Sequence, residues 1–230
     1  MPNNAGRLTW DGAGQKIYEL GVDRGVLYRP TAGVYSLGVA WMGLVNVTES
    51  PSGADNNKFY ADNIEYGAIR GAEEFGGSIE CYTYPDEFKE CNGEMTIVAG
   101  VTGNLQTRKP FGLSYRTKIG NDTDGIDYGY KIHLVYGATV SPSEKAHQTI
   151  NDSPEAETMS FDFETTPVNT KFSDRPLSHI TIDSTKVDSE KLTAFEDIIY
   201  GKDADTTGQT DAVAPRLPLP DEIATIFAEG

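Results

Sequence analysis

Large apolar residues alternate with polar or small ones along several short segments of the chain. In the segment 158–164, Met159, Phe161 and Phe163 fall on one side of an extended chain and polar residues fall on the other. This period of two predicts strands with one buried face. The other segments with strand character are 34–47, 60–66, 77–84, 95–101, 111–115, 130–136 and 179–183.

The connections between these segments indicate an antiparallel arrangement. The polar stretch 120–125 joins two of the segments into a hairpin with an extended tip. A helix is predicted for 188–200, because four apolar residues between Leu192 and Ile199 lie on one stripe and Gly201 follows. The whole pattern is typical of a mainly β protein, an antiparallel β-sandwich or open barrel with a flanking α-helix.

The last thirty residues differ in character from the rest. Three prolines stand between 215 and 220, and 221–228 is predicted to form a short helix. At 230 residues the chain has the length of one substantial domain. We therefore predict a β-domain of residues 1–201, followed in 202–230 by a linker and a short tail, where the linker would allow the tail to swing onto a neighbouring molecule.

A polar segment between two predicted strands is too long for a tight hairpin turn. It comprises Thr48, Glu49, Ser50, Pro51, Ser52, Gly53, Ala54, Asp55, Asn56 and Asn57. Long ordered loops on a strand scaffold usually contact another molecule, so we predict a contact loop here. The alternative is a mobile surface excursion that contacts nothing.

The charge balance limits the classes of partner. Lys and Arg number 19 against 35 Asp and Glu, which gives a net charge of −16. This balance argues against a surface that grips nucleic acid, because contacts with phosphate need clustered cations. Hydrophobic residues make up 38% of the chain and aromatic residues 10%, so we expect a folded protein rather than a disordered acidic tail.

The lack of a recognisable targeting signal and the small number of cysteines indicate a cytosol-like compartment. The N-terminus has no apolar stretch behind a basic start, and no apolar run approaches the roughly 18 residues of a membrane span. We expect no membrane partner. Cys81 and Cys91 are too few for a disulfide scaffold, and their spacing matches neither a redox pair nor a zinc knuckle. Two reduced thiols are expected, one in a strand and one in a loop.

Catalytic and metal-binding signatures are not found in the sequence. Nothing matches a nucleophile elbow, a phosphate-binding loop, a dinucleotide fingerprint, a zinc-protease helix or a kinase signature. The histidines, His133, His147 and His179, are scattered. Two lie on predicted strands and can meet in space to bind a metal, but surface or hydrogen-bonded histidines are commoner. We predict no enzyme, no cofactor and no metal ligand.

The acidic turn 122–127 bears a weak likeness to a calcium-binding EF-hand loop. When its glycine is aligned with the EF-hand turn glycine, Gly120 takes the first ligand position and Lys131 the last. Neither residue has a side chain that binds calcium. A solvated hairpin tip is therefore the prediction for this turn.

Seven blocks of sequence carry a family resemblance. They are 45–54 (VNVTESPSGA), 60–64 (YADNI), 72–80 (AEEFGGSIE), 82–88 (YTYPDEF), 111–117 (FGLSYRT), 128–138 (YGYKIHLVYGA) and 150–156 (INDSPEA). As a set they resemble the major tail protein of long, non-contractile-tailed bacteriophages, which is the subunit of the tail tube. The resemblance covers most of residues 10–200 and is weakest over the last thirty.

The resemblance implies a β-sandwich that assembles into hexameric rings, and the rings stack into a tube. Inner strands of six subunits would close a barrel, and a long loop, here 48–57, would reach the adjacent ring. Implied partners are further copies of the chain, the tape measure, tail terminator and distal tail proteins, and viral DNA that passes through without specific binding. The implied location is the virion, after synthesis in the host cytoplasm.

Two physical considerations agree with such an assembly. Pairing between subunits provides hydrogen-bond partners for the backbone N–H and C=O groups at the free edges of a sandwich. A negatively charged bore does not hold DNA through phosphate contacts. Salt screens charges beyond about 8 Å, so only acids that face the bore matter. Glu65 and Glu80 are our candidates for lumen acids. The alternative for either residue is a solvated exterior position that keeps the free subunit soluble.

Two other functions stay open at this point. The chain can be an acidic β-sandwich that binds carbohydrate or calcium, with Trp10 and Trp41 as ligand platforms. A hydrolase with paired carboxylates is a third reading, without a specific signal in the sequence.

Overall fold

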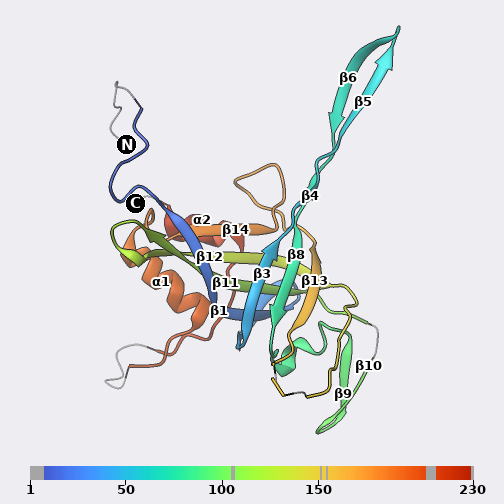
Figure 1. The fold of residues 1–230 in the computed structure, drawn as a ribbon, viewed down its shortest axis with the longest axis vertical. Coiled ribbons are helices and arrows are strands. Elements are labelled where there is room, and N and C mark those ends of the chain that lie inside the picture. Colours follow the sequence, from blue (N-terminus) through green and yellow to red (C-terminus); the bar gives the residue numbers. More distant parts are fainter. Residues whose placement is uncertain (1–7, 105–106, 151, 154, 206–210, 229–230) are drawn as a thin grey trace.

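The computed structural model describes residues 8–104, 107–150, 152–153, 155–205 and 211–228 (Figure 1). The protein is mainly antiparallel β with a large sheet and a flanking helix, and the large sheet does not close into a barrel, which confirms the predicted fold class. The large sheet consists of β1 (Tyr18–Thr31), β2 (Val34–Trp41), β3 (Leu44–Glu49), β8 (Gly76–Cys81), β11 (Phe111–Asn121), β12 (Gly125–Val140), β13 (Met159–Thr165) and β14 (His179–Asp183).

The smaller elements lie outside this sheet. They are β4 (Ser52–Gly53), β5 (Asn56–Ala61), β6 (Ile64–Arg70), β7 (Glu73–Glu74), the short helix η1 (Asp86–Phe88), β9 (Glu94–Val98), β10 (Val101–Asn104), α1 (Ser189–Tyr200) and α2 (Pro220–Phe227).

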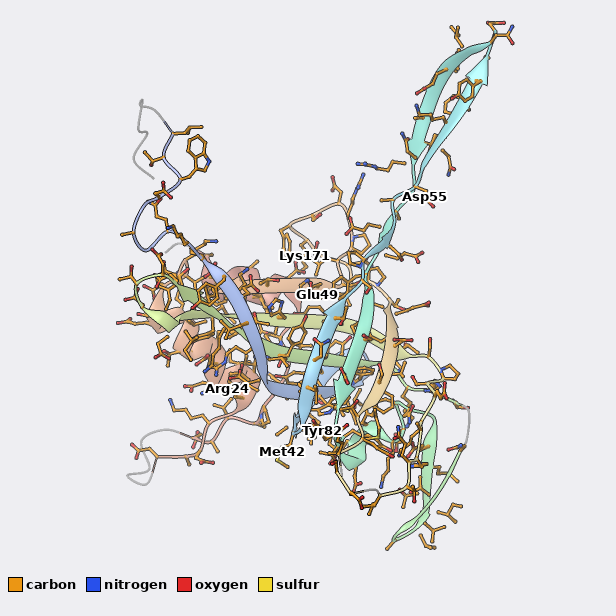
Figure 2. All side chains as sticks on the ribbon, viewed as in Figure 1. Arg24, Met42, Glu49, Asp55, Tyr82 and Lys171 are labelled. Atoms are coloured by element: carbon orange, nitrogen blue, oxygen red, sulfur yellow. The ribbon has the colours of Figure 1, made fainter. Side chains whose placement is uncertain are left out.

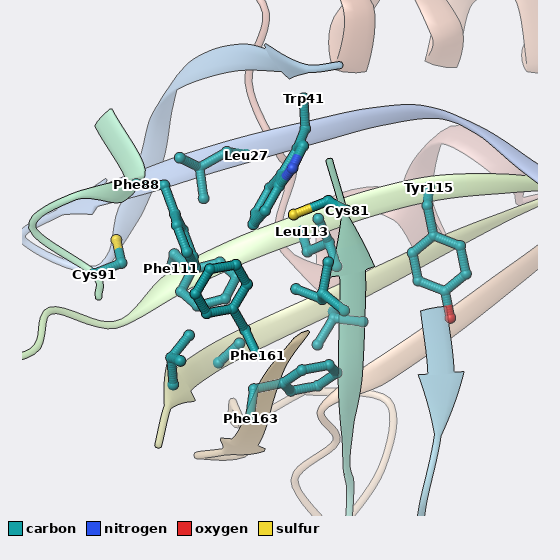
Figure 3. Packing of buried hydrophobic residues seen from close by; sticks show 14 residues of the cluster. Leu27, Trp41, Cys81, Phe88, Cys91, Phe111, Leu113, Tyr115, Phe161 and Phe163 are labelled. Atoms are coloured by element: carbon teal, nitrogen blue, oxygen red, sulfur yellow. The ribbon is translucent and has the colours of Figure 1, made fainter. Parts of the chain in front are cut away.

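The large sheet folds over on itself. Its strand order is β2-β1-β11-β12-β13-β8-β3, and β14 pairs with β12 beside β13. The β3, β8 and β13 half crosses in front of β11 and β12 (Figure 1). Apolar residues from both halves meet in one core, where Phe88 packs against Trp41, Phe111 and Phe161 (Figure 3). The result is a sandwich whose two layers belong to one continuous sheet.

A second core lies on the opposite face of β1, β11 and β12, and the helices cover it. Leu192, Phe195 and Ile199 of α1 are buried there, as the helical stripe predicts. The Asp188 side chain caps the helix by accepting from the amides of Glu190 and Lys191. Segment 215–227 also packs here: Leu217 donates its amide to the Tyr35 carbonyl at 3.0 Å, and Leu217 and Ile223 are buried.

The predicted strands are largely present, with changed boundaries. Phe161 and Phe163 are buried as the alternation in 158–164 predicts. Segment 34–47 is two strands rather than one, because the chain turns at Gly43, whose φ is 79°. Segment 95–101 likewise divides into β9 and β10, and the strand predicted for 77–84 ends at Cys81. Both cysteines are buried free thiols, Cys81 in a strand and Cys91 outside one.

The predictions for 48–57 and 60–66 are wrong in their local structure. Thr48 and Glu49 end β3, and the remainder of the predicted loop forms β4 and the start of β5. The predicted half-buried strand 60–66 is the tip of a hairpin, because the chain reverses at Asp62 and Asn63. Both residues have positive φ, 52° and 64°, which is the geometry of a two-residue type I′ turn. Together, β4 to β7 form a protrusion that we call the arm, residues 50–75 (Figure 1).

Candidate assembly surfaces

The arm is a narrow two-stranded ribbon that projects from the sheet edge. Ser52 and Gly53 pair with Glu74 and Glu73, and six residue pairs between β5 and β6 continue the ribbon to the tip. Figure 2 shows Glu49 at the root of the arm and Asp55 where the terminal hairpin begins. The predicted contact segment is therefore the outgoing strand of the arm, apart from Thr48 and Glu49, which belong to the body.

Large apolar side chains are exposed along the arm. Tyr60, Ile64, Tyr66 and Ile69 have exposed fractions of 66%, 65%, 72% and 65%. A single hairpin is marginally stable in water, and this one has no hydrophobic core of its own. Clustered exposed apolar groups are typical of surfaces that bind another macromolecule. The geometry thus makes the terminal hairpin a candidate interaction surface.

The two predicted lumen acids lie in different parts of the molecule. Glu65 is on β6 of the arm, where its carboxylate pairs with Lys58 Nζ at 2.8 Å. Glu80 is on β8 of the body and accepts a hydrogen bond from the Thr158 hydroxyl at 2.7 Å. The fold therefore does not place them on one continuous strand face.

The outer face of the β3, β8 and β13 half of the sheet carries acidic side chains and no basic ones in these strands. Along β13, Asp162 and Glu164 are exposed while their neighbours in sequence are buried. Glu80 pairs with Ser160, two residues before Asp162, and so belongs to the same outer face. None of these three strands contains a lysine or an arginine. We call this surface the acidic face, and the sequence signal for it was the clean alternation in 158–164.

The sheet also has free edges. In the described part of the chain, β3 pairs with β8 and has no strand partner on its other side. The first half of β1 pairs with β11 only, because β2 reaches no further than Gly25. A groove separates β1 from β3. It is lined by Glu19, Leu20, Gly21, Val22, Val45, Asn46, Val47, Tyr115 and Thr117. Unpaired strand edges favour pairing with another chain.

Where the arm leaves the body, a carboxylate meets two imidazoles. Glu49 Oε1 lies 3.1 Å from His133 Nδ1 and 3.7 Å from His179 Nε2. The Tyr115 hydroxyl donates to the same oxygen at 2.5 Å. The aromatic rings form a stack in the order Tyr115, His133, His179 and Phe75, with centroid separations of 4.7, 5.6 and 4.6 Å. We call Glu49, His133 and His179 the root cluster.

The electrostatics of the root cluster follow from burial and proximity. Contact with His133 lowers the pKa of Glu49 to about 2, and the Tyr115 hydroxyl adds to this effect, although partial burial opposes it. Burial also lowers the pKa of His179. Desolvation and the adjacent carboxylate raise the pKa of Tyr115, so its hydroxyl remains a donor. At neutral pH the cluster holds one carboxylate and a neutral His179 ring.

Sequence reasoning did not bring these three residues together. It placed Glu49 in a contact loop and treated the histidines as scattered, whereas the strand register places His133 and His179 on adjacent strands of one face. Among the residues that the structure describes, this is the one group of at least three potential ligands whose atoms all lie within 4.8 Å of one another. The third histidine, His147, is exposed and lies near Glu157.

The two tryptophans proposed as ligand platforms differ in burial. Trp41 is 3% exposed and donates its indole N–H to the Thr83 carbonyl at 3.0 Å, so it is a core residue and not a ligand platform. Trp10 is exposed. The turn 122–124 connects β11 and β12 as the predicted hairpin tip. In the described part of the chain, neither helix has the length and apolar character needed to cross a membrane.

Comparison with known proteins identifies the family of the chain. A search of curated proteins gave no match to the chain. A family model described as phage tail tube protein matches residues 37–208, a range that includes the arm, the acidic face and α1. Proteins of this family are structural components of phage tails rather than enzymes. The chain therefore belongs to the phage tail tube protein family, as its sequence resemblance predicted, and is a structural virion protein that assembles with itself and with other tail proteins.

Proposed function

We propose that this chain forms hexameric rings that stack into the tail tube of a long, non-contractile phage tail, and that viral DNA passes through the tube into the host. The observation that carries the proposal is the arm. Its apolar side chains are exposed in the single chain, and they become buried when the arm lies against the next ring.

Repetition of this contact explains a tube. An arm that binds a different surface on the next copy makes a head-to-tail contact, and such contacts continue in one direction until something stops them. Within a ring, closure by cyclic symmetry pairs the free edge of β3 with an edge of the neighbouring subunit. Closure satisfies backbone groups of β3 that have no strand partner among the described residues of the single chain. Residues 50–55 of the predicted contact segment then act as one strand of the stem that carries the hairpin outward.

The acidic face is our candidate for the wall of the bore. DNA carries about one negative charge per 1.7 Å of helix, and a surface without cations forms no counterion-releasing contacts with it. Glu80 belongs to this face, whereas Glu65 belongs to the arm and is paired with Lys58. We therefore propose Glu80, Asp162 and Glu164 as the lumen acids. We assign Glu65 to the contact between rings.

The proposed partners beyond the chain itself are those of a tail. The tape measure protein would occupy the bore before ejection, and the terminator and distal tail proteins would bind the two ends of the tube. Synthesis in the host cytoplasm precedes assembly, and the net charge of −16 keeps the free subunit soluble. The carbohydrate-binding alternative is weakened because Trp41, one of its two platforms, is buried.

Removal of the hairpin tests the proposal. Deletion of residues 56–70 joins Asp55 to Gly71, whose amide already donates to the Asp55 carbonyl at 2.9 Å. We expect a folded subunit that forms no tubes by negative-stain microscopy under conditions in which the unaltered chain forms them. The matched control is Ile97→Ser, which removes an exposed apolar side chain from β9 and should leave tubes intact. Normal tubes from the deletion variant would refute the role of the arm.

The bore assignment has its own test. Replacement of Glu80, Asp162 and Glu164 by lysine should preserve tubes but slow DNA ejection from assembled particles, more strongly at low ionic strength. Replacement of three exposed acids elsewhere, Asp127, Glu190 and Asp203, is the charge-matched control. Equal ejection kinetics in both triple variants would show that the acidic face does not line the bore.

A further inference from the structure

We propose that the root cluster, Glu49 with His133 and His179, is a binding site for a divalent transition metal of the zinc class. The proposal concerns the single chain and does not depend on the tube. It departs from our expectation, drawn from the sequence, that the chain has no metal ligand.

The donor set and its spacing match zinc chemistry. Zinc binds histidine nitrogen and carboxylate oxygen at about 2.0–2.2 Å, so ligand atoms around a tetrahedral ion stand roughly 3.3 Å apart. In the root cluster, Glu49 Oε1 is 3.1 Å from His133 Nδ1 and 3.7 Å from His179 Nε2. One carboxylate and two imidazoles leave the fourth position to a water molecule or to the Tyr115 hydroxyl.

Two ring nitrogens in the cluster are buried without a hydrogen bond. They are His133 Nδ1 and His179 Nε2, the same two atoms that face Glu49. His133 is 7% exposed, and its Nδ1 lies close to the carboxylate but out of line for an N–H hydrogen bond. A buried polar atom without a partner is destabilising, and a bound cation removes this penalty for both nitrogens at once.

A neighbouring hydrogen-bond chain favours the tautomer of His133 that metal binding needs. The Thr117 hydroxyl donates to Glu19 at 3.4 Å, and the Thr117 oxygen lies 3.0 Å from His133 Nε2. With its proton directed to Glu19, Thr117 accepts from Nε2–H of the ring. In the metal-bound form, Nδ1 of His133 is then the unprotonated nitrogen that binds the ion. Metal-binding histidines are commonly held by such an outer hydrogen bond.

Binding requires a local rotation of the rings. The planes of His133 and His179 are inclined by 10°, and a nitrogen lone pair lies in the plane of its ring. Two nearly parallel rings that are stacked rather than coplanar cannot both direct their lone pairs at one ion, so His179 must turn about its Cβ–Cγ bond. This rotation weakens its stacking on Phe75, the last residue of the arm.

The position of the site gives it a mechanical role. Glu49 is the last residue of β3 before the arm, His133 lies in β12, and His179 lies in β14. An ion held by all three residues would tie the root of the arm to the centre of the sheet. It would thereby fix the direction in which the hairpin leaves the body.

Metal titration of the untagged chain tests the proposal. After treatment with EDTA and its removal, we expect one Co²⁺ per chain, seen as visible absorption of tetrahedral cobalt, and its displacement by Zn²⁺. Zinc at about 100 times its Kd should raise the Tm by roughly 5–10 °C. Glu49→Gln and His179→Gln should abolish the absorption. Thr117→Val should retain the site but weaken affinity by about 10- to 100-fold, while far-UV circular dichroism confirms folding.

His147→Gln is the matched control, because His147 and Glu157 form an exposed histidine and carboxylate pair elsewhere in the chain. We expect this variant to bind cobalt as the unaltered chain does. Absence of saturable cobalt binding would overturn the proposal. So would binding that survives Glu49→Gln and His179→Gln, or that is lost on His147→Gln, since a surface histidine would then be responsible.

Discussion

The body and the arm are built from similar strands but bury their apolar side chains very differently. In the body, Phe88, Phe111 and Leu113 are completely buried, whereas Tyr60 and Tyr66 of the arm are 66% and 72% exposed. Alternation of apolar and polar residues is present in both regions. The comparison teaches that alternation marks a strand face that will be covered, but it does not tell which molecule covers it.

Amide hydrogen exchange in the free chain should separate the two regions most strongly. The β5 and β6 amides depend on one hairpin, which opens at a cost of about 0–1 kcal/mol. The β11 and β12 amides lie between two cores and should exchange by global unfolding, at about 5–15 kcal/mol. We expect protection to differ by at least 1000-fold, or about 4 kcal/mol. Equal protection in the free chain would contradict the distinction between body and arm.

Truncation of one phenylalanine in each region sharpens the comparison. Phe88 is completely buried and contacts four aromatic rings, and Phe88→Ala should lower the free energy of unfolding by about 3–5 kcal/mol. Phe59→Ala on the arm, where the side chain is 43% exposed, should lower it by less than about 1 kcal/mol. Urea denaturation measures both values. A similar loss in the two variants would mean that the arm folds cooperatively with the body.

The body could be predicted from the sequence because its signals are local. Phe161 and Phe163 alternate with acids, and the stripe from Leu192 to Ile199 repeats at helical spacing, so each pattern identifies its own buried face. The arm was missed because the local pattern of its residues is the same as that of a half-buried strand. Tyr60 to Tyr66 alternates like a half-buried strand, although Asp62 and Asn63 between two apolar groups are a hairpin signal.

The root cluster could not be predicted, because it depends on strand order and register. Glu49 and His133 are separated by 84 residues, and β3 and β12 are not adjacent in the sheet. They meet only because the sheet folds over on itself. No periodicity within either strand carries this information, and a shift of one residue in register would move His133 to the opposite face.

Ion pairs of the body and the arm should differ in strength and in pH dependence. Arg116 donates to both carboxylate oxygens of Asp23 at 2.7 Å, and this hydrogen bonding lowers the pKa of Asp23. The pair therefore stabilises the fold above the unfolded pKa of about 3.9, and the stabilisation is lost as the pH falls through the lower folded value. Asp23→Asn should cost about 1 kcal/mol at pH 7, because the carboxylate is partly exposed.

Glu65→Gln is the counterpart on the arm, since Glu65 and Lys58 form an exposed pair. It should change the free energy of unfolding by less than about 0.5 kcal/mol. Chemical denaturation at a series of pH values measures both variants. The difference between the unaltered chain and Asp23→Asn should shrink below about pH 4. A constant difference down to about pH 3 would show that Asp23 acts through packing rather than through its charge.

The smallest expected gain in stability comes from the turn at the tip of the arm. Asn63 has a φ of 64°, which glycine adopts without strain, and Asp-Gly is among the preferred pairs for a type I′ turn. Asn63→Gly should therefore stabilise the hairpin by a few tenths of a kcal/mol, while Asn63→Val should destabilise it by about 1–2 kcal/mol. Hydrogen exchange of β5 and β6 should follow these changes, with roughly twofold higher protection in the glycine variant. The Tm of the body should stay the same in both variants, because the hairpin of β5 and β6 contributes no residue to either core of the body. A shift in the Tm of the body with Asn63→Val would show instead that the hairpin and the sandwich unfold as one unit.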